Sequence, residues 1–303
     1  ALIPEDQRKA VHLRIGRLLL ASLSPEEVHE KLFDVVGQLN AGAELIDEPA
    51  ERHRVARLNA EAGARAKAST AFRSAVVYLA TAFHLLPGDP WESAPTLAFK
   101  LRRDQASCEL MSGNTAEARR LLEELLPRAR TPADLAAVYR LKSGIHLAAG
   151  EIHAATTCLV ECLARMGMPI PLRPTWDEVV AANEEVQALL GERPIPSLID
   201  LPRMMDRDLE AVVSVLSALS APSSFVDRHL FILHLCRMAS LILRHGMTEA
   251  GAYGLGWYGA VLGAAFKRYR EGHAFGLLAC ALVERYDLTA FRSRIIYLMA
   301  MIT

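Results

Sequence analysis

Hydrophobic residues recur at spacings of three and four along almost the whole chain, and no segment alternates between apolar and polar residues. This pattern predicts an all-α protein without a β-sheet. Within it, Ala75, Ala118 and Ala155 occupy the same place in three units of 34 residues, which are 56–89, 99–132 and 136–169. A unit of this length holds two antiparallel helices, so we expect a superhelical solenoid of stacked helix pairs.

Small residues stand where the two helices of a pair would cross. When each unit is numbered from 1 to 34, Gly63 falls at position 8, and Ala75, Ala118 and Ala155 fall at position 20. A larger side chain at either position would separate the helices and open voids between them. Gly113 and Gly150 fall at position 15, where we expect the turn between the helices.

Two further segments fit the 34-residue repeat loosely. They are 9–42, with Gly16 at position 8, and 253–286, with Gly272 at position 20. Ser24 is expected to cap a helix that begins at Pro25, and Thr175 to open a helix that stops near Gly191.

Between these units the repeat pattern lapses. The segment 191–205 is rich in proline, and we expect it to be a rigid connector. Asp206 is expected to cap the helix after it. A longer apolar helix is expected over 224–244. We therefore predict an N-terminal lobe over 1–190 and a C-terminal helical-repeat lobe over 206–303. The second lobe would be truncated within a helix pair, and we expect both ends to be cut from a longer protein.

Composition narrows the class of protein. Hydrophobic residues make up 51% of the 303 residues, which excludes disorder, and a formal net charge of −1 disfavours binding to nucleic acid. The uncharged stretches 211–226 and 250–266 are shorter than the roughly 20 residues of a spanning helix, so no membrane span is expected. Five cysteines without framework spacing, and no signal-peptide pattern, predict a cytoplasmic protein with reduced thiols.

Motifs that could bind a cofactor or a metal have simpler structural interpretations. Residues 254–259 match the dinucleotide pattern GxGxxG, but a helical segment precedes them instead of a strand. Cys158 and Cys162 lack two further zinc ligands, and only two of the three residues His229, His234 and Cys236 share a helix face. No catalytic residue, cofactor or metal is therefore expected, and we predict that the chain is not an enzyme.

Basic residues gather at one set of repeat positions. In helical-hairpin repeats the first helix of each pair lines the concave face, through positions 2, 5, 9, 12 and 13. No acid occupies these positions here, and the basic residues found there are Arg57, Lys67, Lys100, Arg103 and Arg140. Such a groove could hold an acidic protein segment or a C-terminal carboxylate. The alternative is that these are long side chains on a solvated face.

The three best units resemble tetratricopeptide repeats. Short stretches at 12–19, 36–42, 57–59, 201–202 and 257–259 also make the chain similar to the helical-repeat region of large bacterial multidomain signalling proteins. The resemblance implies a right-handed superhelix. It also implies an AAA/STAND-type ATPase module before the repeats, often with a Ser/Thr kinase further upstream, and a sensor histidine kinase or cyclase after them. The catalytic residues of those modules would lie outside this chain.

The sequence thus predicts a protein-interaction scaffold that relays state between an ATPase and an output module such as a kinase. One alternative keeps the fold but makes it a small-molecule effector sensor of an ATPase-linked transcriptional regulator. An enclosed cavity with polar and aromatic walls would favour that alternative, and an open channel would favour a peptide. An enzyme of unknown type is the remaining alternative.

Overall fold

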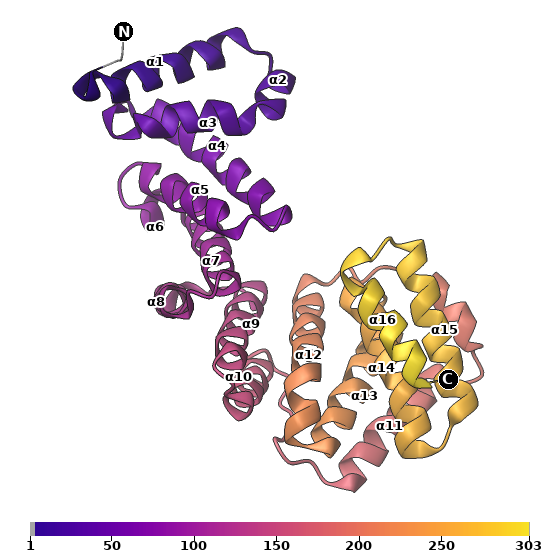
Figure 1. Cartoon of the computed structure of the whole chain (residues 1–303). Coiled ribbons are helices and arrows are strands. Elements are labelled where there is room, and N and C mark those ends of the chain that lie inside the picture. Colours follow the sequence, from indigo (N-terminus) through magenta and orange to yellow (C-terminus); the bar gives the residue numbers. More distant parts are fainter. Residues whose placement is uncertain (1–3, 303) are drawn as a thin grey trace. The chain divides into compact units, whose positions relative to one another are not determined.

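A computed structural model describes residues 4–302, and every element in that range is a helix apart from one isolated bridge between Arg203 and Met247 (Figure 1). The prediction of an all-α protein is confirmed for these residues. Contacts within the chain divide it into two compact units, Ala1–Arg128 and Ala129–Thr303. Each unit is described by itself.

The helices of the first unit are α1 (Glu5–Ser22), α2 (Pro25–Glu30), α3 (Leu32–Ala41), η1 (Ala43–Leu45), α4 (Pro49–Ala68), α5 (Phe72–Leu85), α6 (Pro90–Ser93), α7 (Pro95–Met111), α8 (Thr115–Leu125) and η2 (Leu126–Arg128). The second unit contains α9 (Pro132–Ala148), α10 (Ile152–Arg165), α11 (Trp176–Leu190), η3 (Ile195–Asp200), α12 (Arg207–Val226), α13 (Arg228–His245), α14 (Glu249–Phe266), α15 (Tyr269–Arg285) and α16 (Thr289–Ile302).

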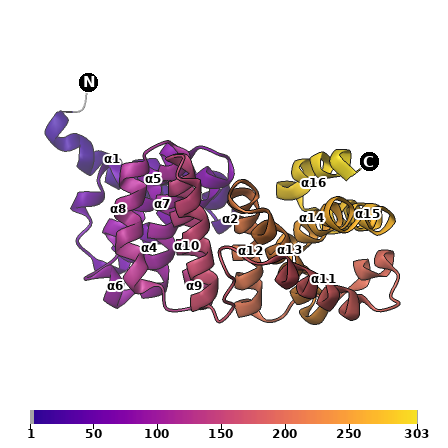
Figure 2. The ribbon, with the colours of Figure 1, turned by 90° about the horizontal axis from the view of Figure 1, so that it is seen from below.

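The three predicted helix pairs are present as α4/α5, α7/α8 and α9/α10. Ala75, Ala118 and Ala155 each lie in the second helix of a pair and are completely buried. In the second unit α14 and α15 form a further closely packed pair, which lies side by side in both ribbon views (Figure 2). Small residues therefore do lie where paired helices meet.

Position 8 of the repeat controls how closely the paired helices approach. A Cβ atom added to Gly63 would lie 2.7 Å from Cγ and Cδ2 of Leu79 on the partner helix. Gly16 of α1 has the same relation to Leu39 of α3, at 2.7 Å from Cδ2. The loose fit of residues 9–42 has a structural cause, because the short helix α2 lies between the two helices of this pair and shifts the second one along the sequence.

The turn between paired helices uses left-handed backbone at position 15. Gly113 and Gly150 have φ values of 84° and 75°, as expected for glycine at this place. Thr70 and Lys267 occupy position 15 of the first and last units, and their φ values of 59° and 62° lie in the same region. The turn geometry is therefore shared by units in which the glycine is missing.

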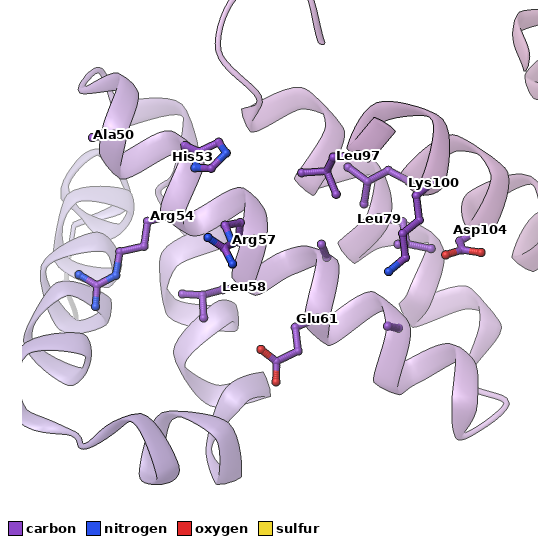
Figure 3. A pocket seen from close by; sticks show the side chains of 13 residues that line it. Ala50, His53, Arg54, Arg57, Leu58, Glu61, Leu79, Leu97, Lys100 and Asp104 are labelled. Carbon is purple, nitrogen blue, oxygen red and sulfur yellow. The ribbon is translucent and has the colours of Figure 1, made fainter. Parts of the chain in front are cut away.

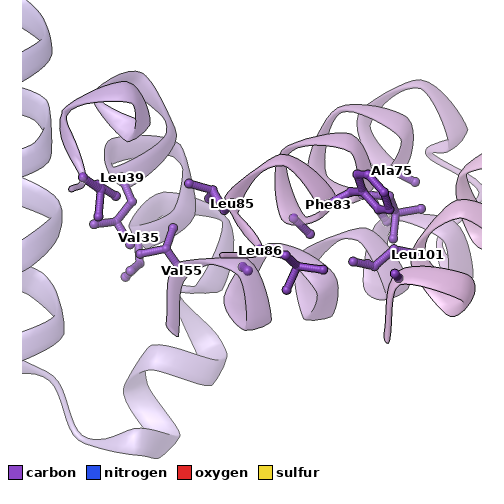
Figure 4. Close-up of a cluster of buried hydrophobic side chains, with 14 of the residues drawn as sticks. Val35, Leu39, Val55, Ala75, Phe83, Leu85, Leu86 and Leu101 are labelled. Atoms are coloured by element: carbon purple, nitrogen blue, oxygen red, sulfur yellow. The ribbon is translucent and has the colours of Figure 1, made fainter. Parts of the chain in front are cut away.

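The hydrophobic core of the first unit runs without interruption from one pair to the next. Val35 and Leu39 of α3 belong to the same cluster as Val55 of α4, Phe83 of α5 and Leu101 of α7 (Figure 4). No single pair encloses these side chains, so each depends on its neighbour for burial.

The proline-rich segment 191–205 lies inside the second unit instead of separating two lobes. η3 packs against α15, and the N–H of Met247 donates to the carbonyl of Pro202 at 2.7 Å. The N–H of Met204 in turn donates to the carbonyl of Met247 at 2.9 Å. The prolines do interrupt the helices, but neighbouring elements satisfy the freed backbone groups, and the contacts divide the chain after Arg128 instead.

Helix boundaries followed the capping residues. Ser24 and Thr175 form capping boxes, and Asp206 caps α12 by accepting from the N–H groups of Asp208 and Leu209. The helix expected over 224–244 begins later in the structure, as α13 at Arg228. Asp227 has extended backbone and accepts from the N–H of Leu230, so it separates α12 from α13.

Within residues 4–302, α12 is long and apolar enough to cross a membrane, judged by length and composition alone. In the second unit this helix packs against α9, α10, α13 and α14. A helix in the core of a folded unit passes the same test.

Replacement of Gly63 by alanine should lower the free energy of unfolding by about 1–3 kcal/mol, because the new methyl group must displace Leu79. The matched control is Gly37→Ala in α3, where nothing lies within 4 Å of the added Cβ. That variant should gain about 0.5–1 kcal/mol from the lower entropy of its unfolded chain. Urea denaturation measures both effects, and equal effects of the two substitutions would contradict the close-packing account.

Candidate functional site

A hollow of about 650 Å³ lies in the first unit between α4 and α7, the first helices of two successive pairs (Figure 3). Its floor is apolar and includes Leu58, Leu79 and Leu101. Charged side chains from both helices surround this floor. The charged and ionisable residues that line the hollow are His53, Arg54, Arg57, Glu61, Lys100 and Asp104.

Arg57 and Lys100 are the two predicted groove residues that line this hollow. Both side chains are exposed, and they come from different helices, Arg57 from α4 and Lys100 from α7 (Figure 3). Neither forms a hydrogen bond or an ion pair with any residue that the structure describes. Each therefore presents a cation whose hydrogen-bonding capacity is free for a ligand.

Lys67 and Arg103, two further predicted groove residues, are paired with an acid. The Nζ of Lys67 donates to Oδ1 of Asp104 at 2.8 Å, and the guanidinium of Arg103 donates to the same oxygen at 3.1 Å. Asp104 is largely buried, with 13% of its side chain exposed. The expected basic groove thus contains a carboxylate that neutralises part of its charge.

Glu61 is the second acid in the hollow, and it is also engaged. Its Oε1 lies 2.8 Å from Nδ1 of His29 and accepts from the guanidinium of Arg65 at 3.1 Å. Both acids of the hollow therefore pair with cations outside its lining. Arg57 and Lys100, together with Arg54 of α4, are left as charges available to a partner.

The repeat pattern does not predict the two acids, because Glu61 and Asp104 both stand at position 6, outside the five positions that define the groove. His53 and Arg54 are not predicted either, because they precede the first unit and α4 begins seven residues before it. The spacing of three between Arg54 and Arg57 is a signal that could have placed them on one helix face.

Arg140, the fifth predicted groove residue, belongs to the second unit. It is exposed on α9 and lines a separate hollow of about 370 Å³ together with residues of α12, α14 and α16. In the described part of the chain it has no hydrogen-bond or ion-pair partner.

The GxGxxG segment lies entirely within α14, and its glycines lie at helix–helix contacts. A Cβ on Gly254 would lie 2.5 Å from the sulfur of Met238 in α13. One on Gly259 would lie 2.6 Å from the carbonyl oxygen of Gly272 in α15. The backbones of α14 and α15 thus approach so closely that only glycine fits at this crossing.

Of the residues considered as metal ligands, Cys158, Cys162, His234 and Cys236 are buried, whereas His229 is half-buried. Burial raises the pKa of Cys158 to about 11 and that of Cys162 to about 12, so both thiols are protonated at neutral pH. The Nδ1 atom of His229 lies 3.1 Å from the carbonyl of Pro174, whereas Nε2 of His234 lies 3.1 Å from the hydroxyl of Ser220. Over residues 4–302, no three histidine, cysteine, aspartate or glutamate side chains are grouped so that they could hold a metal ion.

Comparison with known proteins finds a distant similarity. No family model matches the chain, and no solved structure matches it. The chain is similar to hybrid signal transduction histidine kinase G of Dictyostelium discoideum, with 24% identity over 324 residues. The alignment covers 93% of this chain but 9% of that protein, so the chain spans only a small part of its relative's length.

The buried imidazole of His234 should make the stability of the protein depend on pH. Burial lowers its pKa from 6.5 to about 4, so the unfolded chain takes up a proton between these values while the folded chain does not. Stability should therefore be fully present above pH 6.5 and fall as the pH decreases towards 4, by about 1.4 kcal/mol per pH unit.

The matched variant is His234→Gln, which cannot take up this proton. Urea denaturation between pH 7 and pH 4.5 should show that the difference in stability between wild type and variant shrinks as the pH falls. A constant difference would contradict this, because it would mean that His234 takes up its proton as readily in the folded chain as in the unfolded one.

Proposed function

We propose that this chain is a non-catalytic interaction segment of a multidomain signal-transduction protein, and that the hollow of its first unit binds an acidic protein segment. The segment lies across α4 and α7. Its carboxylates pair with Arg57 and Lys100, and its apolar side chains contact the leucine floor.

The observation that carries this proposal is the pair of cations without partners on two facing helices. An ion pair between exposed groups contributes little, but a carboxylate that accepts hydrogen bonds from guanidinium and ammonium groups beside an apolar floor is held more strongly. Asp104 has an opposing role. By holding Lys67 and Arg103 it limits the positive potential of the hollow, which reduces unspecific attraction of anions.

The signalling context is supported by the similarity to the histidine kinase and by the length of that protein. In this proposal the helix pairs form a right-handed superhelical solenoid within a long cytoplasmic chain. The solenoid relays state between an ATPase module and an output kinase or similar module. It binds protein and not nucleic acid, and it does not span the membrane.

The effector-sensor alternative has one observation in its favour, since the volume of the hollow lies in the range of about 300–1,000 Å³ that is typical of small-molecule sites. The imidazole of His53 is the one ring in its lining. An effector would therefore find few of the aromatic contacts that such sites use, and a protein segment fits the hollow better.

Reversal of the free cations that face each other across the hollow, in Arg57→Glu/Lys100→Glu, should weaken binding of a uniformly acidic peptide at least about tenfold, because two charge-assisted hydrogen bonds become repulsions. Asp104→Asn should tighten binding, because it releases Lys67 and Arg103 towards the ligand. Fluorescence anisotropy with a labelled poly-glutamate peptide measures both effects at low and high salt.

The matched control is Arg73→Glu/Arg119→Glu, which makes the same change of charge at exposed positions of the first unit outside the hollow. This control should retain most of the affinity. An equal loss in control and test variants would show that only net charge matters and would contradict a site between α4 and α7.

A further inference from the structure

A second concave surface lies in the second unit, where two hollows share part of their lining. One, of about 370 Å³, is bounded by Arg140 of α9 and Arg294 of α16. The other has a volume of about 230 Å³ and includes Arg203. Glu210 of α12 and the residues Thr248 and Glu249 at the start of α14 line both hollows. The two hollows therefore form one groove, which we call the mixed-charge groove.

The charges of the mixed-charge groove follow a fixed order. Arg140 and Arg294 line only the larger hollow, Arg203 lines only the smaller one, and Glu210 and Glu249 line both. Cations thus flank a central pair of carboxylates. Within the described residues none of these five side chains forms an ion pair or a hydrogen bond, although the Arg203 guanidinium lies 5.3 Å from the centre of the Tyr286 ring.

Uncharged side chains in the mixed-charge groove can contact the side chains of a bound protein segment. Met205 is 88% exposed at one end, and Phe291 contributes an aromatic ring at the other. Methionine adapts its shape to different partners, which is why it is common at binding surfaces. On α12, Ser214 lies four residues after Glu210, and Ser217 lies three residues after Ser214. All three therefore lie on the same helix face.

We propose that the mixed-charge groove binds an extended protein segment in which a lysine or arginine stands between two acidic residues. The central cation pairs with Glu210 and Glu249. The acid on one side pairs with Arg203, and the acid on the other pairs with Arg140 and Arg294. Charge complementarity excludes nucleic acid and uniformly acidic segments, because their central anion would meet two carboxylates. The proposal does not depend on the hollow of the first unit.

Two peptides of identical composition test the order of charges. The probes are the N-acetylated, C-amidated heptapeptides SESKSES and SKSESES, each carrying a neutral fluorophore. In an extended peptide, residues two apart lie on one face, so the first presents acid, base and acid in sequence to the groove. Anisotropy titrations with the whole chain should show that the first peptide binds about fivefold tighter or more. Equal affinities would overturn the proposal.

Substitutions in the groove test whether the first peptide binds there. Glu210→Gln/Glu249→Gln should lower affinity for the first peptide about tenfold, as the central cation loses its acceptors. The control Glu184→Gln/Glu192→Gln makes the same change of charge at exposed positions of the second unit outside the groove and should bind as wild type does. An equal loss in the control would overturn the proposal.

A reversal of charge gives a gain of binding that simple misfolding cannot imitate. In a chain that also carries Arg57→Glu/Lys100→Glu, which weakens acidic-peptide binding by the first unit, Glu210→Lys/Glu249→Lys should raise the affinity for a third peptide, SESESES, which the unchanged groove rejects. Arg57→Glu in the first unit should leave binding of SESKSES unchanged, and a loss there would show that the peptide sits in the other hollow. If acidic peptides fail to bind the first unit, only the function proposed above fails.

Discussion

Close approach of paired helices is the constraint on which the rest of this structure depends. Gly63 lies against Leu79, Gly16 against Leu39, and Gly259 against the backbone of Gly272, each with no room for a side chain. Because the helices of a pair approach so closely, neither can enclose an apolar core alone, and the core passes from pair to pair. Substitution at these contacts would therefore disturb surfaces well beyond one helix.

The same constraint positions the charged side chains. In the first unit α5 packs closely against both α4 and α7, while α4 and α7 themselves touch only slightly, which leaves a gap between them with Leu79 and Leu101 beneath it and long side chains at its rim. Asp104 and Glu61 hold some cations in place, while Arg57 and Lys100 stay unpaired. The selectivity of the hollow thus depends on which cations are already paired, and not on the number of basic residues.

Much of the fold could be predicted from residues with one strong local role. Ala75 and Gly63 gave the helix pairs, and Ser24, Thr175 and Asp206 gave helix starts, because small size and side-chain capping act over a few residues. Tertiary features could not be predicted in this way. Thr70 takes a left-handed turn that its side chain disfavours, α2 interrupts the first pair, and the proline-rich segment 191–205 docks on distant helices. Asp104 could not be predicted from the repeat positions, because its side chain stands one position outside the expected face and still reaches Lys67.

The central claim is that the hollow between α4 and α7 receives an acidic protein segment, and a spin-labelled acidic peptide tests it most directly. The peptide broadens the NMR signals of amides close to its bound position. The account predicts that broadening is strongest around Arg57 on α4 and Lys100 on α7, while the signals of α8 and of the second unit stay sharp. Broadening spread over all basic surfaces, or concentrated away from α4 and α7, would contradict it.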